Sequence, residues 1–238
     1  MNRYLKILFG MDRPRLDGRL LRSRPPASLR TATLIFVVGN LLPLALMAAT
    51  ASISEGTTGF TVIMVTQPIL LLLLIFIAEG GRAFPLESPD TAKVALFAIL
   101  WPALLRIVTI VVAALQAPLG LVAEESNNPL MMDLGMTGIE RAIMVVAVVL
   151  LIPIAEEFFY RDFLYRSLGR LGPGWAAAIS SLFWALMHGS LPLILPLSIV
   201  GMLLTLLYET TGNLGAPILA HIGFNLSSLL MVFLLPMF

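Results

Sequence analysis

The sequence predicts an all-α fold, a polytopic transmembrane helix bundle of about seven or eight spans. Of its 238 residues, 58% are hydrophobic and 12% are charged, whereas an ordinary globular domain is about 45–50% apolar and about 25% charged. Several apolar runs reach roughly 18 residues or more, enough to cross a hydrocarbon core about 30 Å thick. These runs should be helices, because a backbone surrounded by lipid must satisfy its own hydrogen bonds.

The apolar runs divide the chain into two membrane-embedded halves. The seven expected spans are residues 31–53, 61–78, 93–117, 139–171, 174–190, 191–208 and 214–236. An eighth span would follow if residues 93–117 or 174–208 divide differently. The longest irregular connection contains an Asn-Asn-Pro run, which is typical of a loop. We therefore expect a basic segment (1–30), an N-terminal transmembrane half (31–117), an extracytoplasmic loop (118–138) and a C-terminal transmembrane half (139–238).

The distribution of charge predicts the orientation of these spans. Eight of the 15 basic residues precede residue 31, so the positive-inside rule places the N-terminus in the cytoplasm. The loops at 54–60 and 118–138 carry only acids, whereas those at 79–93 and 161–172 carry basic residues, as this orientation requires. The first apolar run begins too late and is too long for a cleavable signal peptide. The chain is thus expected to be an integral, multi-pass membrane protein.

Two adjacent glutamates interrupt an apolar run in the C-terminal half, and ionisable residues inside a span are functional by default. Glu156 and Glu157 follow an unbroken apolar stretch that starts at Ile143. Their side chains point about 100° apart on a helix, so they cannot do the same work. Glu157 and Arg161 stand at i and i+4, within reach of an ion pair. That pairing leaves Glu156 free for chemistry.

The two histidines of the chain, His188 and His221, lie in the apolar stretches that follow. Counting outward from the Gly172-Pro173-Gly174 turn places Glu156 and His188 both roughly 21–23 Å from it, so two antiparallel helices bring them level. His221 and Asn225 share a helix face. However, His221 is only about 10–12 Å from the turn before it. That mismatch disappears if residues 161–171 form a surface helix, or if residues 209–214 lie inside the membrane envelope.

These residue types suit hydrolysis by an activated water. A glutamate in an apolar pocket can act as a general base beside a histidine, and a further His and Asn could stabilise an oxyanion. The absence of cysteine excludes thiolate catalysis. Neither a Gly-x-Ser-x-Gly elbow nor a His-Glu-x-x-His pair occurs. Arg106, inside the third span, is expected either to reach the membrane interface or to neutralise one of the glutamates.

Three motifs in the C-terminal half resemble those of the CPBP intramembrane proteases, also called the Abi or CAAX protease family. They are Glu-Glu-x-x-x-Arg, Phe-x-x-x-His and His-x-x-x-Asn, matched here by Glu156, Glu157 and Arg161, by Trp184 and His188, and by His221 and Asn225. In the second motif, Trp184 stands where the family has phenylalanine. The resemblance covers roughly residues 140–238 and makes residues 139–238 the catalytic half.

The resemblance implies a reaction and a set of partners. By it, Glu156 and His188 would activate water, His221 and Asn225 would form the oxyanion site, and Glu157 and Arg161 would orient them. The substrate would be a membrane-associated or prenylated protein or peptide, within the lipids of a bacterial plasma membrane and without nucleic acid. A reaction without a cofactor is favoured. Zn²⁺ held by Glu156, His188 and His221 is the alternative.

Two other functions also fit these residues. Intramembrane Glu and His residues also build proton relays, so the chain could be a proton-coupled transporter. Transporters commonly carry paired repeats, however, whereas the polar groups of this chain gather in one half. A non-catalytic immunity or binding protein of the membrane is the third alternative.

Overall fold

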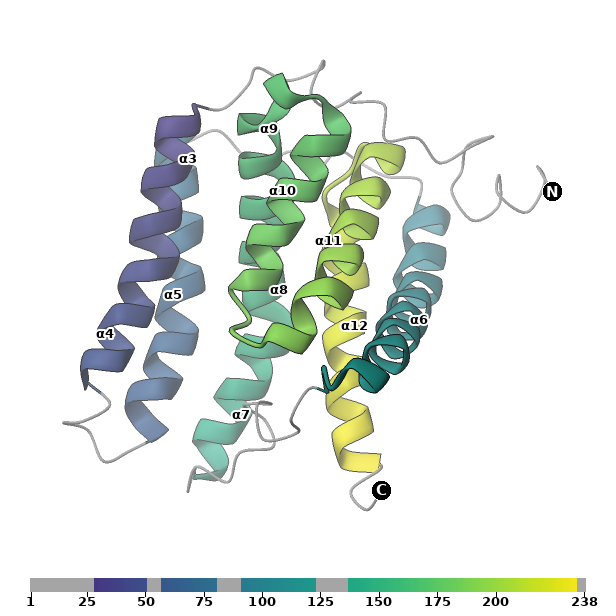
Figure 1. The fold of residues 1–238 in the computed structure, drawn as a ribbon. Coiled ribbons are helices and arrows are strands. Elements are labelled where there is room, and N and C mark those ends of the chain that lie inside the picture. The colour runs from purple at the N-terminus through teal and green to yellow at the C-terminus, as the bar shows by residue number, and fades with distance from the viewer. Residues whose placement is uncertain (1–27, 51–56, 81–90, 123–136, 235–238) are drawn as a thin grey trace.

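The computed structural model describes residues 28–50, 57–80, 91–122 and 137–234, and in these ranges the secondary structure is helical, without strands (Figure 1). This confirms the predicted all-α bundle. Five helices are long and apolar enough to cross a membrane, and Gly215–Met231 is a shorter apolar helix. The chain is therefore an integral, multi-pass membrane protein. The basic segment before residue 28 and loop residues 123–136 lie outside the described residues, so their expected locations stay predictions.

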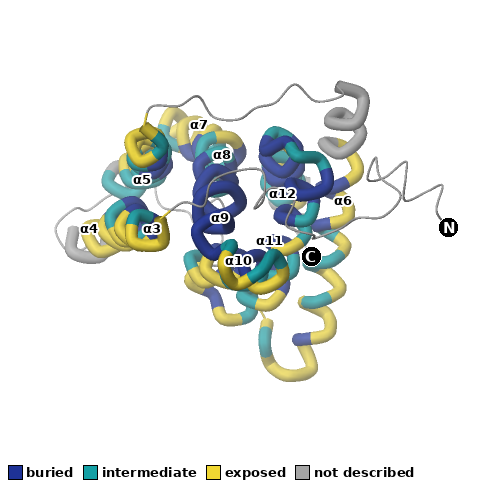
Figure 2. The backbone as a smooth tube through the Cα atoms, turned by 90° about the horizontal axis from the view of Figure 1, so that it is seen from above, coloured by how far each residue is buried: buried dark blue, intermediate teal, exposed yellow. Residues whose placement is uncertain are grey.

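The N-terminal half flanks the C-terminal half on two sides. Helix α3 (Leu29–Phe36) continues through the π-helical turn η1 (Val37–Leu41) into α4 (Leu42–Thr50), and α5 (Thr57–Ala78) runs back beside it. Helix α6 (Thr91–Gln116) ends in the 3-10 turn η2 (Ala117–Leu119). In both views, α3 to α5 lie on one side of the bundle and α6 on the other (Figures 1 and 2).

A single long helical segment runs through the centre of the bundle and is deeply buried along its second half (Figure 2). It consists of α7 (Gly138–Val146), η4 (Ala147–Leu151), α8 (Ile152–Glu156), η5 (Glu157–Leu164) and α9 (Tyr165–Ser167). Thr137 and Glu140 form a capping box that starts it, which satisfies backbone N–H groups that a first turn leaves unpaired. Two π-helical stretches, η4 and η5, flank α8 and its last residue, Glu156.

Three helices complete the C-terminal half: α10 (Pro173–Leu186), α11 (Leu191–Thr211) and α12 (Gly215–Leu234). Glycines with positive φ, at 85°, 66° and 68°, stand in the turns before α10, before α11 and after α11. The turn at Gly189 ends α10 earlier than the expected span 174–190. With 14 residues, α10 is about 21 Å long and too short for a 30 Å core. Accordingly, the α10–α11 turn stops above the lower ends of α7 and α12 (Figure 1).

Helices α10 and α11 pack closely where Gly201 faces Ser181. A Cβ atom on residue 201 would lie 2.7 Å from the Cβ of Ser181 and 3.2 Å from its Cα. Because the nearest atoms belong to the backbone and to a short side chain, they cannot rotate away. This contact therefore fixes how α10, which carries Trp184 and leads to His188, lies on α11.

Gly201→Ala is expected to lower the free energy of unfolding by about 1–3 kcal/mol, the usual cost of overpacking a core. Thermal unfolding of the purified protein in detergent measures this. Adding Ser181→Gly removes the clashing side chain and should restore most of the loss. Gly174→Ala is the matched control, because its Cβ would meet nothing within 4 Å. Equal unfolding temperatures for Gly201→Ala and Gly174→Ala would contradict the close contact.

Candidate active site

Glu156, at the end of α8, is contacted by side chains from two other helices. The indole Nε1–H of Trp184 on α10 donates a 2.6 Å hydrogen bond to Glu156 Oε2. His221 Nε2 on α12 lies 3.8 Å from the same oxygen. The Glu156 side chain stays 18% exposed, so it is the accessible member of the glutamate pair. Its carboxylate can thus be held by the protein and still meet a water.

Glu157 bridges two partners in the fully buried layer next to Glu156. Arg161 Nε lies 3.2 Å from Glu157 Oε2, which confirms the ion pair expected from the i, i+4 spacing. The other oxygen, Oε1, is 2.8 Å from His221 Nδ1. A carboxylate held by an arginine accepts this hydrogen bond, so Nδ1 carries the proton and Nε2 faces Glu156. Sequence reasoning missed this contact, because residues 157 and 221 meet only through tertiary structure.

His188 lies in the turn after α10 and is exposed. Its Nδ1 is 2.9 Å from the backbone oxygen of Trp184. A carbonyl oxygen only accepts, so Nδ1 is protonated and Nε2 of the neutral ring is a free acceptor. Among the described residues no hydrogen bond joins His188 to Glu156, but the Trp184 side chain contacts both of them. The Trp184 contact brings the end of α10 beside Glu156, four residues before His188.

His221 reaches the depth of Glu156 because the connection before α12 is set into the protein. Glu209 and Thr210 at the end of α11, and Asn213 and Leu214 in the connection, are all buried. The connection lies lower than the α9–α10 connection (Figure 1). The alternative expectation, a surface helix over residues 161–171, is wrong. Residues 157–168 instead continue the central segment and are buried.

Asn225 contacts the central helical segment rather than the glutamates. Its Nδ2 donates a 2.9 Å hydrogen bond to the carbonyl oxygen of Val148 within η4. An amide nitrogen carries two hydrogens, so one N–H of Asn225 is left for another acceptor. Asn225 therefore ties α12 to η4 one turn below His221.

Arg106 fastens α6 to α12, which corrects the expected pairing with a glutamate. Its Nη2 donates to Phe224 O at 2.8 Å, to Ser227 Oγ at 3.0 Å and to Ser228 Oγ. Its guanidinium lies 4.2 Å from the centre of the Phe224 ring. Within the described residues, Arg106 thus pairs with no glutamate, and its guanidinium holds the helix that carries His221 and Asn225.

A second buried polar layer joins the central segment to α11 above the site. Tyr165 Oη donates to Glu209 Oε1 at 2.7 Å, and Tyr208 Oη donates to Asp162 Oδ1 at 2.8 Å. Sequence reasoning assigned none of these four residues a part. The adjacent Tyr208-Glu209 pair at the end of an apolar run was the signal that could have found them. These two hydrogen bonds hold the end of α11 against the central segment, and the start of α12 follows directly after it.

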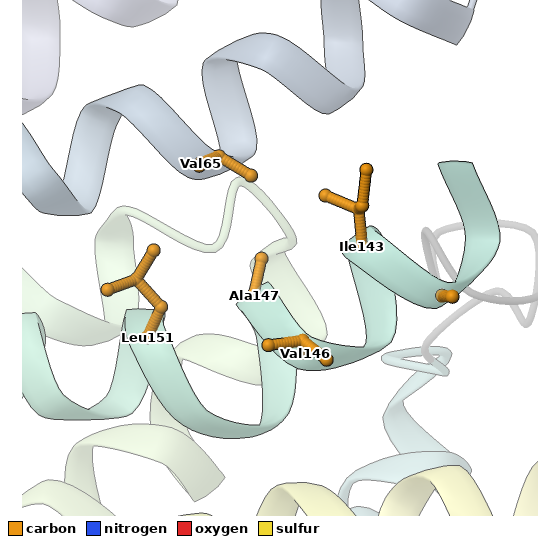
Figure 3. A pocket seen from close by; sticks show the side chains of 6 residues that line it. Val65, Ile143, Val146, Ala147 and Leu151 are labelled. Carbon is orange, nitrogen blue, oxygen red and sulfur yellow. The ribbon is translucent and has the colours of Figure 1, made fainter. Parts of the chain in front are cut away.

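A wholly apolar groove of about 310 Å³ lies between α5 and the lower central segment (Figure 3). Val65 lines one side, and Ile143, Val146, Ala147 and Leu151 line the other (Figure 3); Ala142 is the sixth lining residue. Glu156 follows Leu151 by five residues, which turns it about 140° around the helix. The groove therefore faces away from Glu156 and is not part of the candidate active site.

The donor atoms do not form a three-ligand metal site as they stand. Among the described residues no group of three or more His, Asp and Glu side chains is gathered closely enough to hold a metal ion. The Trp184 and Glu157 hydrogen bonds use Glu156 Oε2 and His221 Nδ1, and they leave Glu156 Oε1 and His221 Nε2 as possible ligand atoms. Zinc held by Glu156, His188 and His221 therefore stays a prediction.

Comparison with known proteins gives one family match. Residues 138–227 match the family model described as type II CAAX prenyl endopeptidase Rce1-like. No curated protein and no solved structure matches the chain. The matched range contains all six candidate site residues, whereas α6 with Arg106 lies outside it.

Proposed function

Residues 138–227 belong to the CAAX protease family, and on this premise we propose that the chain is an intramembrane endopeptidase that hydrolyses a prenylated CAAX-type peptide. The observation that carries the proposal is a convergence of side chains. Glu156 from the central segment, Trp184 from α10 and His221 from α12 meet within hydrogen-bonding or near contact distance, with His188 beside them. Five helices of the chain are long and apolar enough to cross a membrane. The prenyl group of a lipidated substrate would lie in the same bilayer.

Glu156 is the proposed general base. We place a water between Glu156 and His188. It donates one hydrogen to the Glu156 carboxylate and the other to His188 Nε2, so its lone pairs point away from both acceptors and toward the substrate. Glu156 takes a proton as the water oxygen adds to the carbonyl carbon of the scissile bond. The same proton then passes to the leaving nitrogen and the C–N bond breaks, which releases an amine and a carboxylic acid; the proton of the acid then passes to the amine.

His221 and Asn225 are the proposed stabilisers of the oxyanion. In this role the Nδ1–H of His221 stays with Glu157, and a hydrogen on Nε2 donates to the developing charge. The second N–H of Asn225 adds a donor if the substrate carbonyl lies between the two residues. Glu157 and Arg161 act by holding His221, since both are completely buried.

The experiment uses the full chain in liposomes with a farnesylated peptide that ends in a CAAX sequence. Mass spectrometry of the released tripeptide is the readout, and a non-prenylated copy of the peptide tests the need for the lipid. Release from the prenylated peptide supports the proposal. No release from either peptide, together with proton uptake by the liposomes, would favour the transporter instead.

Chelation is expected to leave this cleavage unchanged, because the proposed base acts on water directly. The assay is run after dialysis against 1,10-phenanthroline, with metal content measured before and after. Full activity in protein shown to be free of zinc is the expected result. Loss of activity that is restored by added Zn²⁺ would contradict the metal-free mechanism.

A further inference from the structure

We propose that Trp184 is a positioning residue that aligns Glu156 and His188 for water activation, an inference that rests on the proposed function. Trp184 contacts both groups with separate polar atoms. Its indole N–H donates to Glu156 Oε2 at 2.6 Å, and its backbone oxygen accepts from His188 Nδ1 at 2.9 Å. The first bond fixes the carboxylate, and the second fixes the tautomer and orientation of the imidazole.

The indole is itself held from several sides. Trp184 is fully buried, and the Arg161 guanidinium lies 4.5 Å from its ring centre. The rings of His188 and His221 meet it edge-on, with centroids 4.9 Å and 5.3 Å away. Arg161 Nη1 and Nη2 make no hydrogen bond within the described part of the chain. This buried cation is therefore stabilised by its ion pair with Glu157 and by the faces of the Trp184 and Tyr160 rings, of which Trp184 is the nearer.

The indole N–H distinguishes a positioning role from a packing role. A buried tryptophan needs a partner for its N–H, and here that partner is the proposed base. Phenylalanine, the residue of the matching family motif, has a similar flat ring but no donor. In this chain the hydrogen bond therefore adds an interaction that the motif alone does not supply, and the carboxylate should be misaligned without it.

Trp184→Phe is the test, measured as kcat and KM on the farnesylated peptide. Positioning predicts a fall in kcat of about 10-fold or more, the range for loss of a hydrogen bond to a charged group, with KM changed less than about two-fold. Trp101→Phe is the matched control for shrinking a buried tryptophan, because Trp101 is also buried but lies on α6. Unchanged kcat in folded Trp184→Phe would overturn the inference, since packing alone tolerates phenylalanine.

A spectroscopic measurement decides the question without relying on activity. In the Trp101→Phe/Trp175→Phe background, Trp184 is the single tryptophan, and the ultraviolet resonance Raman band of the indole N–H reports its hydrogen bond. Adding Glu156→Ala should shift this band to the position of a weakly bonded indole. A band that does not move would overturn the inference, even if Trp184→Phe fails to fold. If the band moves while the wild type cleaves nothing, the contact stands and the proposed function fails instead.

Discussion

Glu156→Gln is expected to lower kcat for the prenylated peptide by about 10²–10⁴-fold, the usual contribution of a general base. Glutamine has the same shape and can still accept the Trp184 hydrogen bond through its amide oxygen, but it cannot take a proton from water. The unfolding temperature should therefore stay close to that of the wild type. The measurement is a progress curve of tripeptide release in liposomes, at equal protein content.

Glu140→Gln is the matched control, because Glu140 lies on the same central segment and glutamine still completes the capping box with Thr137. Its kcat should equal that of the wild type. Cleavage by folded Glu156→Gln at the wild-type rate would remove Glu156 from the reaction. In that case the water-activating mechanism is wrong, whatever the other side chains do.

Glu157→Ala is expected to have the largest effect on stability, a loss of about 3–5 kcal/mol in the free energy of unfolding. Arg161 is completely buried beside Glu157, and removing one partner of a buried pair leaves an uncompensated charge. His221 loses its Nδ1 acceptor in the same step. Denaturant or thermal unfolding in detergent, followed by near-ultraviolet circular dichroism, measures the loss.

The double variant Glu157→Leu/Arg161→Met separates charge from packing. Well-packed apolar residues can replace a buried ion pair without loss of stability, so the double variant should unfold at a higher temperature than Glu157→Ala. Its kcat should nevertheless fall, because nothing then orients His221. Arg170→Ala, at an exposed arginine, is the control and should change little. If Glu157→Ala is as stable as this control, the buried pair does not hold the core.

The helices were predictable because lipid imposes a length and an apolar composition that can be read from single residues. The exception is α10, which ends at Leu186 because Gly189 adopts a left-handed conformation. The position of such a turn cannot be predicted from the apolar composition of the run. Counting outward from the Gly172-Pro173-Gly174 turn brought Glu156 and α10 together because this short turn joins the two helices. For His221 the count left a mismatch, which the buried residues before α12 explain.

Within the candidate site, contacts between residues close in sequence were predictable and contacts between helices were not. The Glu157–Arg161 pair follows from helix geometry alone. The bond from Glu157 to His221 and the bond from Trp184 to Glu156 depend on how three helices are rotated against one another. In the sequence, Trp184 was only an imperfect match to phenylalanine. The hydrogen bond of its N–H could not be predicted, because the sequence does not show that Glu156 lies beside the indole.

The π-helical turn η4 has a consequence for how the length of the central segment can vary. A single π turn is an α-helix that has taken in one extra residue, so deleting one residue within 147–151 would return it to α-helix and leave the segments on either side facing as before. Asn225 would lose its acceptor at Val148, but Glu156 would still face Trp184. Residues 152–156 are α-helical and contain no extra residue, so a deletion there would turn Glu156 about 100° around the helix axis. Deletion of one residue should therefore be tolerated in η4 but not in α8.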